Sequence, residues 1–396
     1  PELFRTHEHY YTLGGALDHR GREVTPIDYD GLKKIIKKLK SSGIRHVGVV
    51  GKFSCRNPIH EQKVREVLKK SFRKVFLGHW ISGNLNFPRR IATTFLNASV
   101  YPIHKNFFEA VEKSLEKKGL QVPIHILKAD GGTMSLSASI NYPSQTILSG
   151  PSASIMGAIP FTRNNEEVLI LDIGGTTTDM AIILNQVPLL EPVGIELAGY
   201  KTRIRALQTR STGLGGDSVL KVVDGALKIG PKRLGDALAF GGPAPTPTDA
   251  LCVLGKLKDG DVTKAAEGIK QLAAELTLSV EQTAQTIYEQ FCRAVLDEAQ
   301  AMVNNINSKP FYTVHEYWED HQVRPDRILL LGGPAPYFAE QMQAIAGIPA
   351  VAVPRWSVAN AMGAAFARTT SEVNLFADTQ QGFITAPEDN YYETIG

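Results

Sequence analysis

Cysteine is scarce in this chain of 396 residues, which contains only Cys55, Cys252 and Cys292. The three lie far apart in the sequence and form no Cys-x-x-Cys pair, so their spacing predicts no disulfide framework, zinc ribbon or iron–sulfur site. Dispersed thiols of this kind are typical of proteins in a reducing compartment. We therefore expect a cytoplasmic protein.

Long apolar runs and an excess of one charge are also absent. No segment approaches the roughly 20 apolar residues that a membrane-spanning helix needs, and no signal peptide precedes the first expected strand. The 43 lysines and arginines nearly balance the 40 aspartates and glutamates, for a formal net charge of +3. The composition therefore favours neither a nucleic acid nor a membrane as a partner.

Alternating strand and helix patterns fill most of the chain and predict an α/β fold. In the densest basic stretch, Lys33–Lys40, lysines share the segment with apolar residues at helical spacing, which indicates an amphipathic helix with one solvated face. Asp28 or Asp30 would cap that helix. Residues 241–249 predict an ordered loop or a linker, and the polar tail after Asn374 predicts a loosely held end. Further helices are predicted at residues 57–68, 90–100, 105–118, 262–276, 280–304 and 357–368, and strands at 46–50, 75–77, 123–127, 168–171, 180–184 and 327–331.

The most informative segment reads LILDIGGTTTD, at residues 169–179. The apolar run Val168–Leu171 predicts a strand buried on both faces, which delivers Asp172 at its end beside a turn. The second apolar run, Met180–Leu184, predicts a return strand, so the two form a hairpin. This excludes the P-loop of nucleotide-binding proteins, because that loop leads into a helix and ends in Gly-Lys-Ser/Thr.

The turn of this hairpin has the composition of an anion-binding loop. Gly174 and Gly175 have no side chains, so backbone N–H groups can approach an anion closely, and the hydroxyls of Thr176 and Thr177 add donors. An ordinary Gly-Thr turn is the alternative interpretation. The second aspartate, Asp179, favours the functional interpretation, because two carboxylates then bracket the glycines and threonines.

Four other short motifs accompany this loop in a fixed order. Together the five motifs resemble the nucleotide site of the superfamily of actin, sugar kinases and heat-shock chaperones. The resemblance implies two actin-like (ribonuclease H-like) α/β lobes with mixed sheets flanked by helices, which close on ATP. The motifs are SGPSASIMGAI at 149–159, TGLGGDSV at 212–219, ILLLGGPAP at 328–336 and NAMGAAFA at 360–367.

Within that superfamily the chain resembles the hydantoinase A and oxoprolinase group, which includes N-methylhydantoinase and acetone carboxylase subunits. The resemblance implies a first lobe at residues 1–160, a second lobe at 161–375 with a helical insertion at about 250–310, and a tail at 376–396. The segments that carry it are ALDHRGREVTPIDYDGLKKI at 16–35, NPIHEQKVREVL at 57–68, TTFLNASVYPI at 93–103, TILSGPSASIMGA at 146–158 and PTPTDALCVLGKL at 245–257.

The same resemblance assigns roles to individual residues. Asp172 and Asp179 are expected to hold Mg²⁺, through waters because Mg²⁺ dehydrates reluctantly. Asp217 is expected to orient metal or water, and together these three form the expected catalytic set; for Asp217, a plain turn aspartate is an equally good interpretation. The small-residue helices at 150–158 and 359–367 look like the crossing helices of the hinge. The residues expected to bind ATP are Gly174, Gly175, Thr176, Thr177, Gly215, Gly216, Gly332 and Gly333.

For activity, the resemblance implies an ATP-dependent hydrolase that opens a cyclic amide of the hydantoin or 5-oxoproline type. Phosphorylation of the amide oxygen creates a leaving group, after which water opens the ring. The chain would be this enzyme or its ATP-binding subunit, with a second hydantoinase- or carboxylase-type subunit or further copies of itself as partners. Two alternatives are a non-catalytic nucleotide-binding or regulatory member and an ATP-driven activase. Activases carry cysteine-bound iron–sulfur clusters, so the dispersed cysteines count against that interpretation.

Three further features of the first lobe complete the sequence-based expectations. Family members carry another Gly-Gly-Thr phosphate loop on the first strands of this lobe, and none precedes Tyr10. We therefore expect a first lobe that is incomplete at its amino terminus, through truncation, supply by another polypeptide, or loss. The segment His7-Glu8-His9 resembles a zinc-binding pair, although a polar strand face is the simpler interpretation. Asp130-Gly131-Gly132 could contact substrate or form an ordinary turn.

Overall fold

A computed structural model describes residues 9–191, 193–308, 322–386, 389 and 391–395. Contacts between Cα atoms divide the chain into two compact units. Unit 1 comprises Pro1–Leu148, Glu191–Ala206 and Arg368–Gly396, and unit 2 comprises Ser149–Leu190 and Leu207–Ala367. Residues 149–160, which the sequence assigned to the end of the first lobe, therefore group with unit 2.

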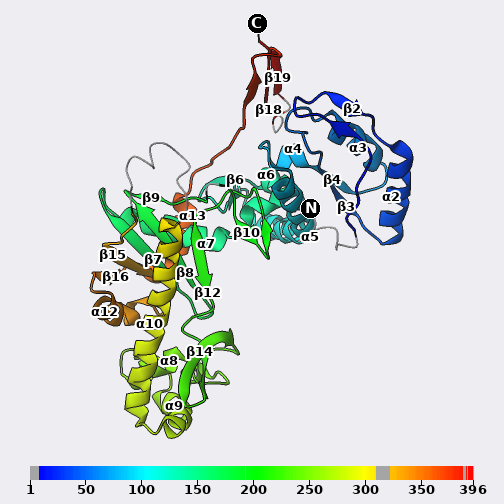
Figure 1. Cartoon of the computed structure of the whole chain (residues 1–396). Helices are drawn as coiled ribbons and strands as arrows, with labels where there is room; N and C mark the ends of the chain where they lie inside the picture. The colour runs from blue at the N-terminus through cyan, green and yellow to red at the C-terminus, as the bar shows by residue number, and fades with distance from the viewer. Residues whose placement is uncertain (1–8, 192, 309–321, 387–388, 390, 396) are drawn as a thin grey trace. The chain divides into compact units, whose positions relative to one another are not determined.

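A mixed sheet forms the centre of unit 2 (Figure 1). Strand β7 (Glu167–Ile173) pairs antiparallel with β8 (Thr178–Leu184), as the hairpin prediction required. On its other edge β7 pairs parallel with β15 (Arg327–Leu331), which pairs parallel with β16 (Ala350–Ala352). Beyond β8 lie β12 (Thr209–Thr212) and the short β9 (Val187–Pro188).

Alternate residues of β7 face two different hydrophobic cores, because successive side chains of a strand point to opposite faces. Val168 and Ile170 contribute to the core beneath α7 (Ser149–Ala158) and α13 (Ala359–Phe366). Leu169, Leu171 and Ile173 contribute to the core beneath the helices on the other face. Those helices are α8 (Pro247–Val253), α10 (Val280–Asn307) and α12 (Ala335–Ala346). Burial on both faces explains why the strand reads as one continuous apolar run.

Helices α7 and α13 approach each other closely enough to require glycine. A Cβ atom at Gly157 would lie 2.0 Å from the Ala359 carbonyl oxygen, and one at Gly363 would lie 1.9 Å from the Ala153 carbonyl oxygen. These small-residue helices were predicted to cross, and their close packing is confirmed. It is also the physical reason why α7 belongs to unit 2.

A second layer of unit 2 consists of a hairpin and helices. Strands β13 (Ser218–Val223) and β14 (Ala226–Arg233) pair antiparallel and pack with α8, α9 (Val262–Leu276) and α10 on a smaller core. The short helices of this unit are η2 (Ile159–Phe161), η3 (Leu238–Phe240) and η4 (Trp356–Val358).

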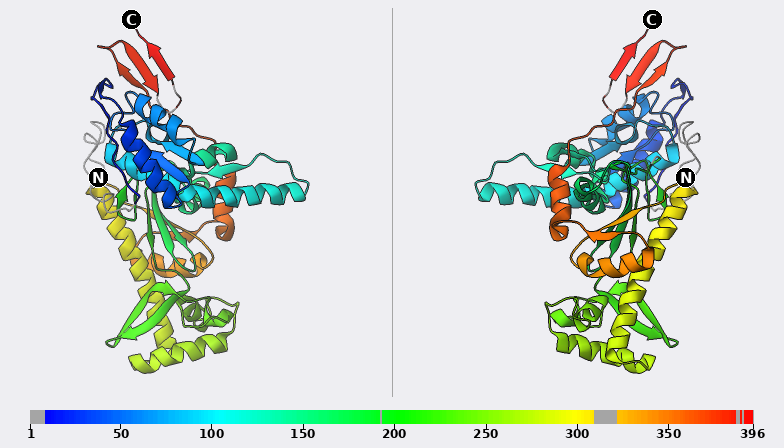
Figure 2. Two further views of the ribbon diagram at one scale, coloured as in Figure 1. Left: turned by 90° about the vertical axis from the view of Figure 1, so that its right-hand side faces the viewer. Right: turned by 90° about the vertical axis from the view of Figure 1, so that its left-hand side faces the viewer.

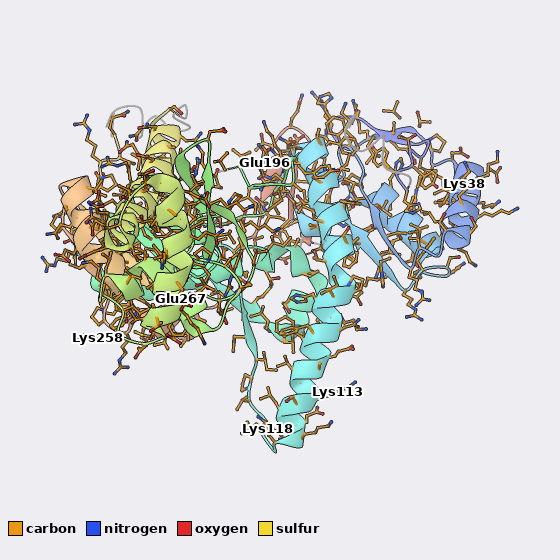
Figure 3. The ribbon with its side chains drawn as sticks, turned by 90° about the horizontal axis from the view of Figure 1, so that it is seen from below. Lys38, Lys113, Lys118, Glu196, Lys258 and Glu267 are labelled. Carbon is orange, nitrogen blue, oxygen red and sulfur yellow. The ribbon has the colours of Figure 1, made fainter. Side chains whose placement is uncertain are left out.

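Unit 1 contains small sheets with helices packed around them. Parallel strands β3 (His46–Val49) and β4 (Lys74–Leu77) form a core with α2 (Tyr29–Ser41) and α3 (Ile59–Leu68). Asp28 caps α2, as predicted, by accepting a hydrogen bond from the Gly31 N–H at 2.8 Å, and Lys38 lies on the exposed face (Figure 3). The remaining elements are β1 (Ala16–Leu17), β2 (Glu23–Thr25), α4 (Gly78–Ile81), α5 (Phe87–Lys117), β5 (His125–Leu127), β6 (Thr133–Ser135), α6 (Leu136–Asn141), η1 (Pro143–Thr146), β10 (Glu196–Leu197), β11 (Tyr200–Lys201), β17 (Phe376–Asp378), β18 (Phe383–Ala386) and β19 (Tyr391–Thr394).

A buried carboxylate ties α3, α4 and α5 of unit 1 together. Glu61 accepts hydrogen bonds from Ser54 Oγ at 2.5 Å and from His79 Nδ1 at 2.6 Å, and Arg90 Nη2 lies 3.3 Å from its Oε1. The side chains of Glu61, His79 and Arg90 are at most 1% exposed. A charge buried this deeply is stable only when it is paired in this way.

Two predictions about secondary structure are wrong. The helices expected at 90–100 and 105–118 form one helix, α5, which continues through Pro102 and extends away from the rest of unit 1 (Figure 2). The tail, which was expected to be loosely held, forms the antiparallel sheet β17-β18-β19. The loop expected at 241–249 is present as far as Thr246, and α8 begins at Pro247. Among the described residues, no helix is long and apolar enough to span a membrane.

Candidate nucleotide site

Two aspartates face each other across the β7–β8 hairpin. Asp172 and Asp179 are register partners, with the turn 174–177 immediately beyond them. The Ser154 hydroxyl of α7 donates a hydrogen bond to Asp172 Oδ2 at 2.5 Å, and Ser211 of β12 hydrogen-bonds to Asp179. Each carboxylate is thus held by a hydroxyl from a neighbouring element, which fixes both side chains at one edge of the loop.

Burial raises the pKa of both carboxyls. At Asp172 the loss of solvent is the main cause, and the Ser154 hydrogen bond partly opposes it. At Asp179 burial again dominates, the Ser211 hydrogen bond opposes it, and the neighbouring Asp172 charge adds to the increase. Two partly buried carboxylates with raised pKa values form a site that a cation would stabilise.

The turn itself leaves a row of backbone donors without acceptors. The Gly174 N–H donates to the Thr177 carbonyl at 2.9 Å, which closes the turn. In the part of the chain that the structure describes, the N–H groups of Gly175, Thr176 and Thr177 have no hydrogen-bond acceptor. Successive free N–H groups in a turn form a concave anion-binding surface.

A second glycine loop packs directly against this turn. The Gly216 N–H donates to the Gly174 carbonyl at 2.9 Å, and the Asp217 N–H donates to the Gly175 carbonyl at 2.8 Å. A Cβ atom at Gly215 would lie 2.4 Å from the Gly175 carbonyl oxygen. The two backbones therefore touch, which only residues without a side chain permit.

Asp217 is already engaged by an arginine. Its Oδ2 lies 2.8 Å from Arg233 Nη2, and its Oδ1 accepts a hydrogen bond of 3.4 Å from Thr248 Oγ1 at the start of α8. Burial raises the pKa of Asp217, and the Arg233 charge is the main opposing influence. The carboxylate of Asp217 is therefore already paired with a positively charged side chain, that of Arg233.

The turn after β15 completes the cluster. Gly332 has a φ of +89°, which favours glycine, and a Cβ atom there would lie 2.2 Å from the Ile173 carbonyl oxygen and 2.7 Å from Asp172 Oδ1. A Cβ atom at Gly333 would meet nothing within 4 Å. Gly332 is therefore required by packing against β7, whereas Gly333 faces open space.

The structure brings the predicted site residues of unit 2 together, and their roles in binding stay predictions. Sequence reasoning missed Ser154, Arg233 and Thr248, which contact the predicted aspartates from distant parts of the chain. Among the described residues, no group of three or more His, Cys, Asp or Glu side chains could hold a metal ion, so any metal here rests on the Asp172–Asp179 pair. His7 and Glu8 lie outside the described residues.

The loop Asp130-Gly131-Gly132 belongs to unit 1. Asp130 Oδ1 accepts from the Gly132 N–H at 3.0 Å, which is the contact of an ordinary Asx turn, and its Oδ2 pairs with Lys128 Nζ at 3.1 Å. These contacts match the ordinary turn that the sequence left as an alternative.

Comparison with known proteins shows which family the chain resembles. The Hydantoinase/oxoprolinase family matches residues 90–373, and the Hydantoinase/oxoprolinase N-terminal region matches residues 3–72. The chain is 27% identical over 274 residues to the caprolactamase subunit alpha of Pseudomonas jessenii, which covers 66% of this chain and 39% of that protein. It is 24% identical over 360 residues to 5-oxoprolinase 1 of Arabidopsis thaliana, which covers 85% of this chain and 28% of that protein.

A solved structure shows the same fold. The nucleotide-free structure of acetone carboxylase matches with a TM-score of 0.72 at 22% identity, covering 93% of this chain and 55% of that one. This match confirms the predicted α/β fold with mixed sheets flanked by helices. The chain spans less than half the length of the two curated relatives described above. Because the family match extends over most of its residues, this chain belongs to the hydantoinase/oxoprolinase family.

Proposed function

We propose that this chain provides the nucleotide site of an ATP-dependent hydrolase that opens a cyclic amide, either as the enzyme itself or as its ATP-binding subunit. The observation that carries the proposal is the Asp172–Asp179 pair beside a turn with three free N–H groups. Relatives named caprolactamase and 5-oxoprolinase support a lactam as substrate.

The residues fit a nucleotide and a divalent cation. The N–H groups of Gly175, Thr176 and Thr177 would bind phosphate oxygens, and Gly333 offers an open backbone surface for the adenosine. Asp172 and Asp179 would hold Mg²⁺, whose charge would offset the cost of ionising both carboxyls in a buried place. The chemistry supplied by ATP is phosphoryl transfer to the amide oxygen, which converts it into a leaving group for ring opening by water.

We propose the same partners and location as the sequence predicted. A second subunit of the hydantoinase or carboxylase type is favoured because relatives are named as the alpha subunit of caprolactamase and the gamma subunit of acetophenone carboxylase. Assembly with further copies of the chain and location in the cytoplasm stay predictions.

The test is ATP turnover in the presence of small cyclic amides. We expect 5-oxoproline, hydantoin or caprolactam to stimulate phosphate release by the full-length protein with its partner subunit present. Asp172→Asn should abolish the stimulated rate, and Glu267→Gln should leave it unchanged, since Glu267 is an exposed acid on α9 of the same unit (Figure 3). If no lactam or imide stimulates turnover, the substrate class is wrong. Tight ATP binding without any turnover would favour the regulatory alternative instead.

An activase role is disfavoured by the state of the cysteines. Cys55, Cys252 and Cys292 are all buried, and none of them forms a disulfide. Burial raises the pKa of the Cys252 thiol to about 11 and that of Cys292 further. Iron–sulfur clusters are held by cysteine thiolates at characteristic spacings, and the three thiols of this chain show no such spacing. A protein purified without iron or colour would agree with this conclusion.

A further inference from the structure

Arg233, the last residue of β14, reaches across to the phosphate loop. Its Nη1 donates to Thr176 Oγ1 at 3.0 Å, and a Cβ atom at Gly175 would lie 3.5 Å from its Cζ. The guanidinium therefore lies against the backbone of the turn that carries the free N–H groups. A residue from a different hairpin thus places a permanent positive charge beside an anion-binding loop.

The guanidinium is held by four acceptors on three sides. Its Nη2 contacts Asp217 Oδ2 at 2.8 Å and Asp236 Oδ1 at 2.8 Å, and its Nε donates to the Gly235 carbonyl at 3.1 Å. An arginine has five N–H donors. With Thr176 as the fourth acceptor, one N–H on Nη1 has no acceptor among the described residues. The unused donor is thus on the nitrogen nearest the loop.

The two carboxylates that hold Arg233 differ in their surroundings. Asp217 is 16% exposed and is fixed by its backbone hydrogen bond to Gly175 and by Thr248, whereas Asp236 is 69% exposed. Asp217 therefore orients the guanidinium permanently, while Asp236 is a solvated partner that an incoming anion can replace at small cost.

We propose that Arg233 binds the phosphate chain of the nucleotide, with Asp217 as its positioning residue and Asp236 as the partner that phosphate oxygens displace. The proposal rests on the proposed nucleotide site and adds a residue to it. Arginine donates two parallel hydrogen bonds to phosphate, which lysine cannot reproduce. It also gives Asp217 a different task from metal or water orientation.

The test compares nucleotide binding with nucleoside binding by calorimetry in the presence of Mg²⁺. Arg233→Met should weaken ATP and ADP binding about tenfold to hundredfold, which corresponds to one lost charge-assisted interaction. Adenosine binding should be unchanged, because the contact is to phosphate only. Lys232→Met removes the same charge from the preceding residue of β14 and should leave ATP binding within about twofold of the unmodified chain.

The outcomes separate this inference from the proposed function. If the unmodified chain binds ATP and Arg233→Met binds it equally well, Arg233 has no phosphate role and the inference is overturned while the nucleotide site stands. If the unmodified chain does not bind ATP, both fall. If Arg233→Met fails to fold, Arg233→Lys is the variant to measure. Lysine keeps the positive charge but cannot donate two parallel hydrogen bonds to phosphate. ATP binding that is several-fold weaker, with adenosine binding unaffected, would support the inference. ATP binding equal to that of the unmodified chain overturns it.

Discussion

The Ser154 hydroxyl on α7 donates a hydrogen bond of 2.5 Å to Asp172 at the end of β7. The bond favours the ionised carboxylate, whereas burial favours the protonated form. A single serine therefore keeps a buried carboxyl closer to the charged state that a cation requires. Ser154 lies on α7, a helix that contributes no residue to the predicted catalytic set.

Replacing Ser154 by alanine should raise the pKa of Asp172 further, because only the opposing influence is lost. We expect Ser154→Ala to weaken Mg²⁺-dependent ATP binding, with a larger effect at pH 6 than at pH 8, and to cost about 1 kcal/mol of folding stability. Ser152→Ala is the matched control, since Ser152 Oγ is buried on the same helix and has no hydrogen-bond partner among the described residues. Equal pH profiles for the two variants would contradict the role of Ser154.

Asp172→Asn should stabilise the unliganded chain at neutral pH while abolishing Mg²⁺-dependent ATP binding. The folded protein holds the Asp172 proton more tightly than the unfolded chain does, so stability decreases as the pH rises from about 4 through the raised folded pKa. Asparagine does not ionise, so the variant does not lose this stability as the pH rises. Urea unfolding at pH 7 and pH 3 checks the sign: the variant should be the more stable at pH 7, and the gain should disappear at pH 3. A variant that is less stable at pH 7 would show that the charge is well solvated.

Gly157→Ala should destabilise unit 2 by about 1–3 kcal/mol, because the added methyl group would lie 2.0 Å from the Ala359 carbonyl oxygen. Gly150→Ala is the control on the same helix, where a Cβ atom would meet nothing within 4 Å. That substitution should be neutral or stabilising by about 0.5–1 kcal/mol, as alanine favours helix. Chemical unfolding measures both. Similar losses for the two variants would mean that the contact with α13 is not the cause of the destabilisation.

Glu61→Gln should destabilise unit 1 by about 3–5 kcal/mol at pH 7, since it leaves Arg90 buried without its carboxylate. Burial alone would raise the pKa of Glu61, but the hydrogen bond and charge of His79, followed by Arg90 and Ser54, bring it below its usual value. The stability from this group is therefore present above pH 4.3 or so and is lost as the pH falls through the lowered folded pKa.

The pH dependence of unfolding distinguishes this network from a surface effect. The parent chain should lose stability as the pH falls below about 4.3, and Glu61→Gln should lose less over the same acid range. Glu66→Gln on the same helix removes an exposed carboxylate paired with Lys69 and should retain most of the parent's profile, because an exposed ion pair contributes little to stability. A Glu61→Gln profile that parallels the parent would mean that other groups control the acid transition.

Local patterns predicted much of the fold. Strands β7, β8 and β15 and helix α9 form at the expected residues. Each buries a face whose apolar residues follow one another, or recur at helical spacing, within a short stretch of sequence, so a local pattern is enough to predict it. The break expected between residues 100 and 105 does not occur, and α5 continues through Pro102, although a proline inside a helix removes one hydrogen bond at a cost of about 3 kcal/mol. The buried first half of α5, from Arg90 to Tyr101, supplies packing that proline rules leave out.

The site was predictable only where it is continuous in sequence. Asp172, the turn and Asp179 lie within eight successive positions, so their spacing predicts that they belong to one site. Arg233 contacts Thr176 from 57 positions away, and no periodicity links an arginine at the end of a hairpin to a loop formed by another. Such contacts depend on how sheets pack, which single-sequence patterns do not encode.

Ser154 and Gly157 lie one turn apart on α7, with the hydroxyl of one on Asp172 and the backbone of the other against α13. Helix α7 cannot move along α13 without lengthening the hydrogen bond between Ser154 and Asp172. Ionisation of Asp172 and the fit of the two helices are therefore thermodynamically linked: a fit that strengthens the Ser154 hydrogen bond favours the ionised carboxylate, and ionisation favours that fit to the same extent in free energy.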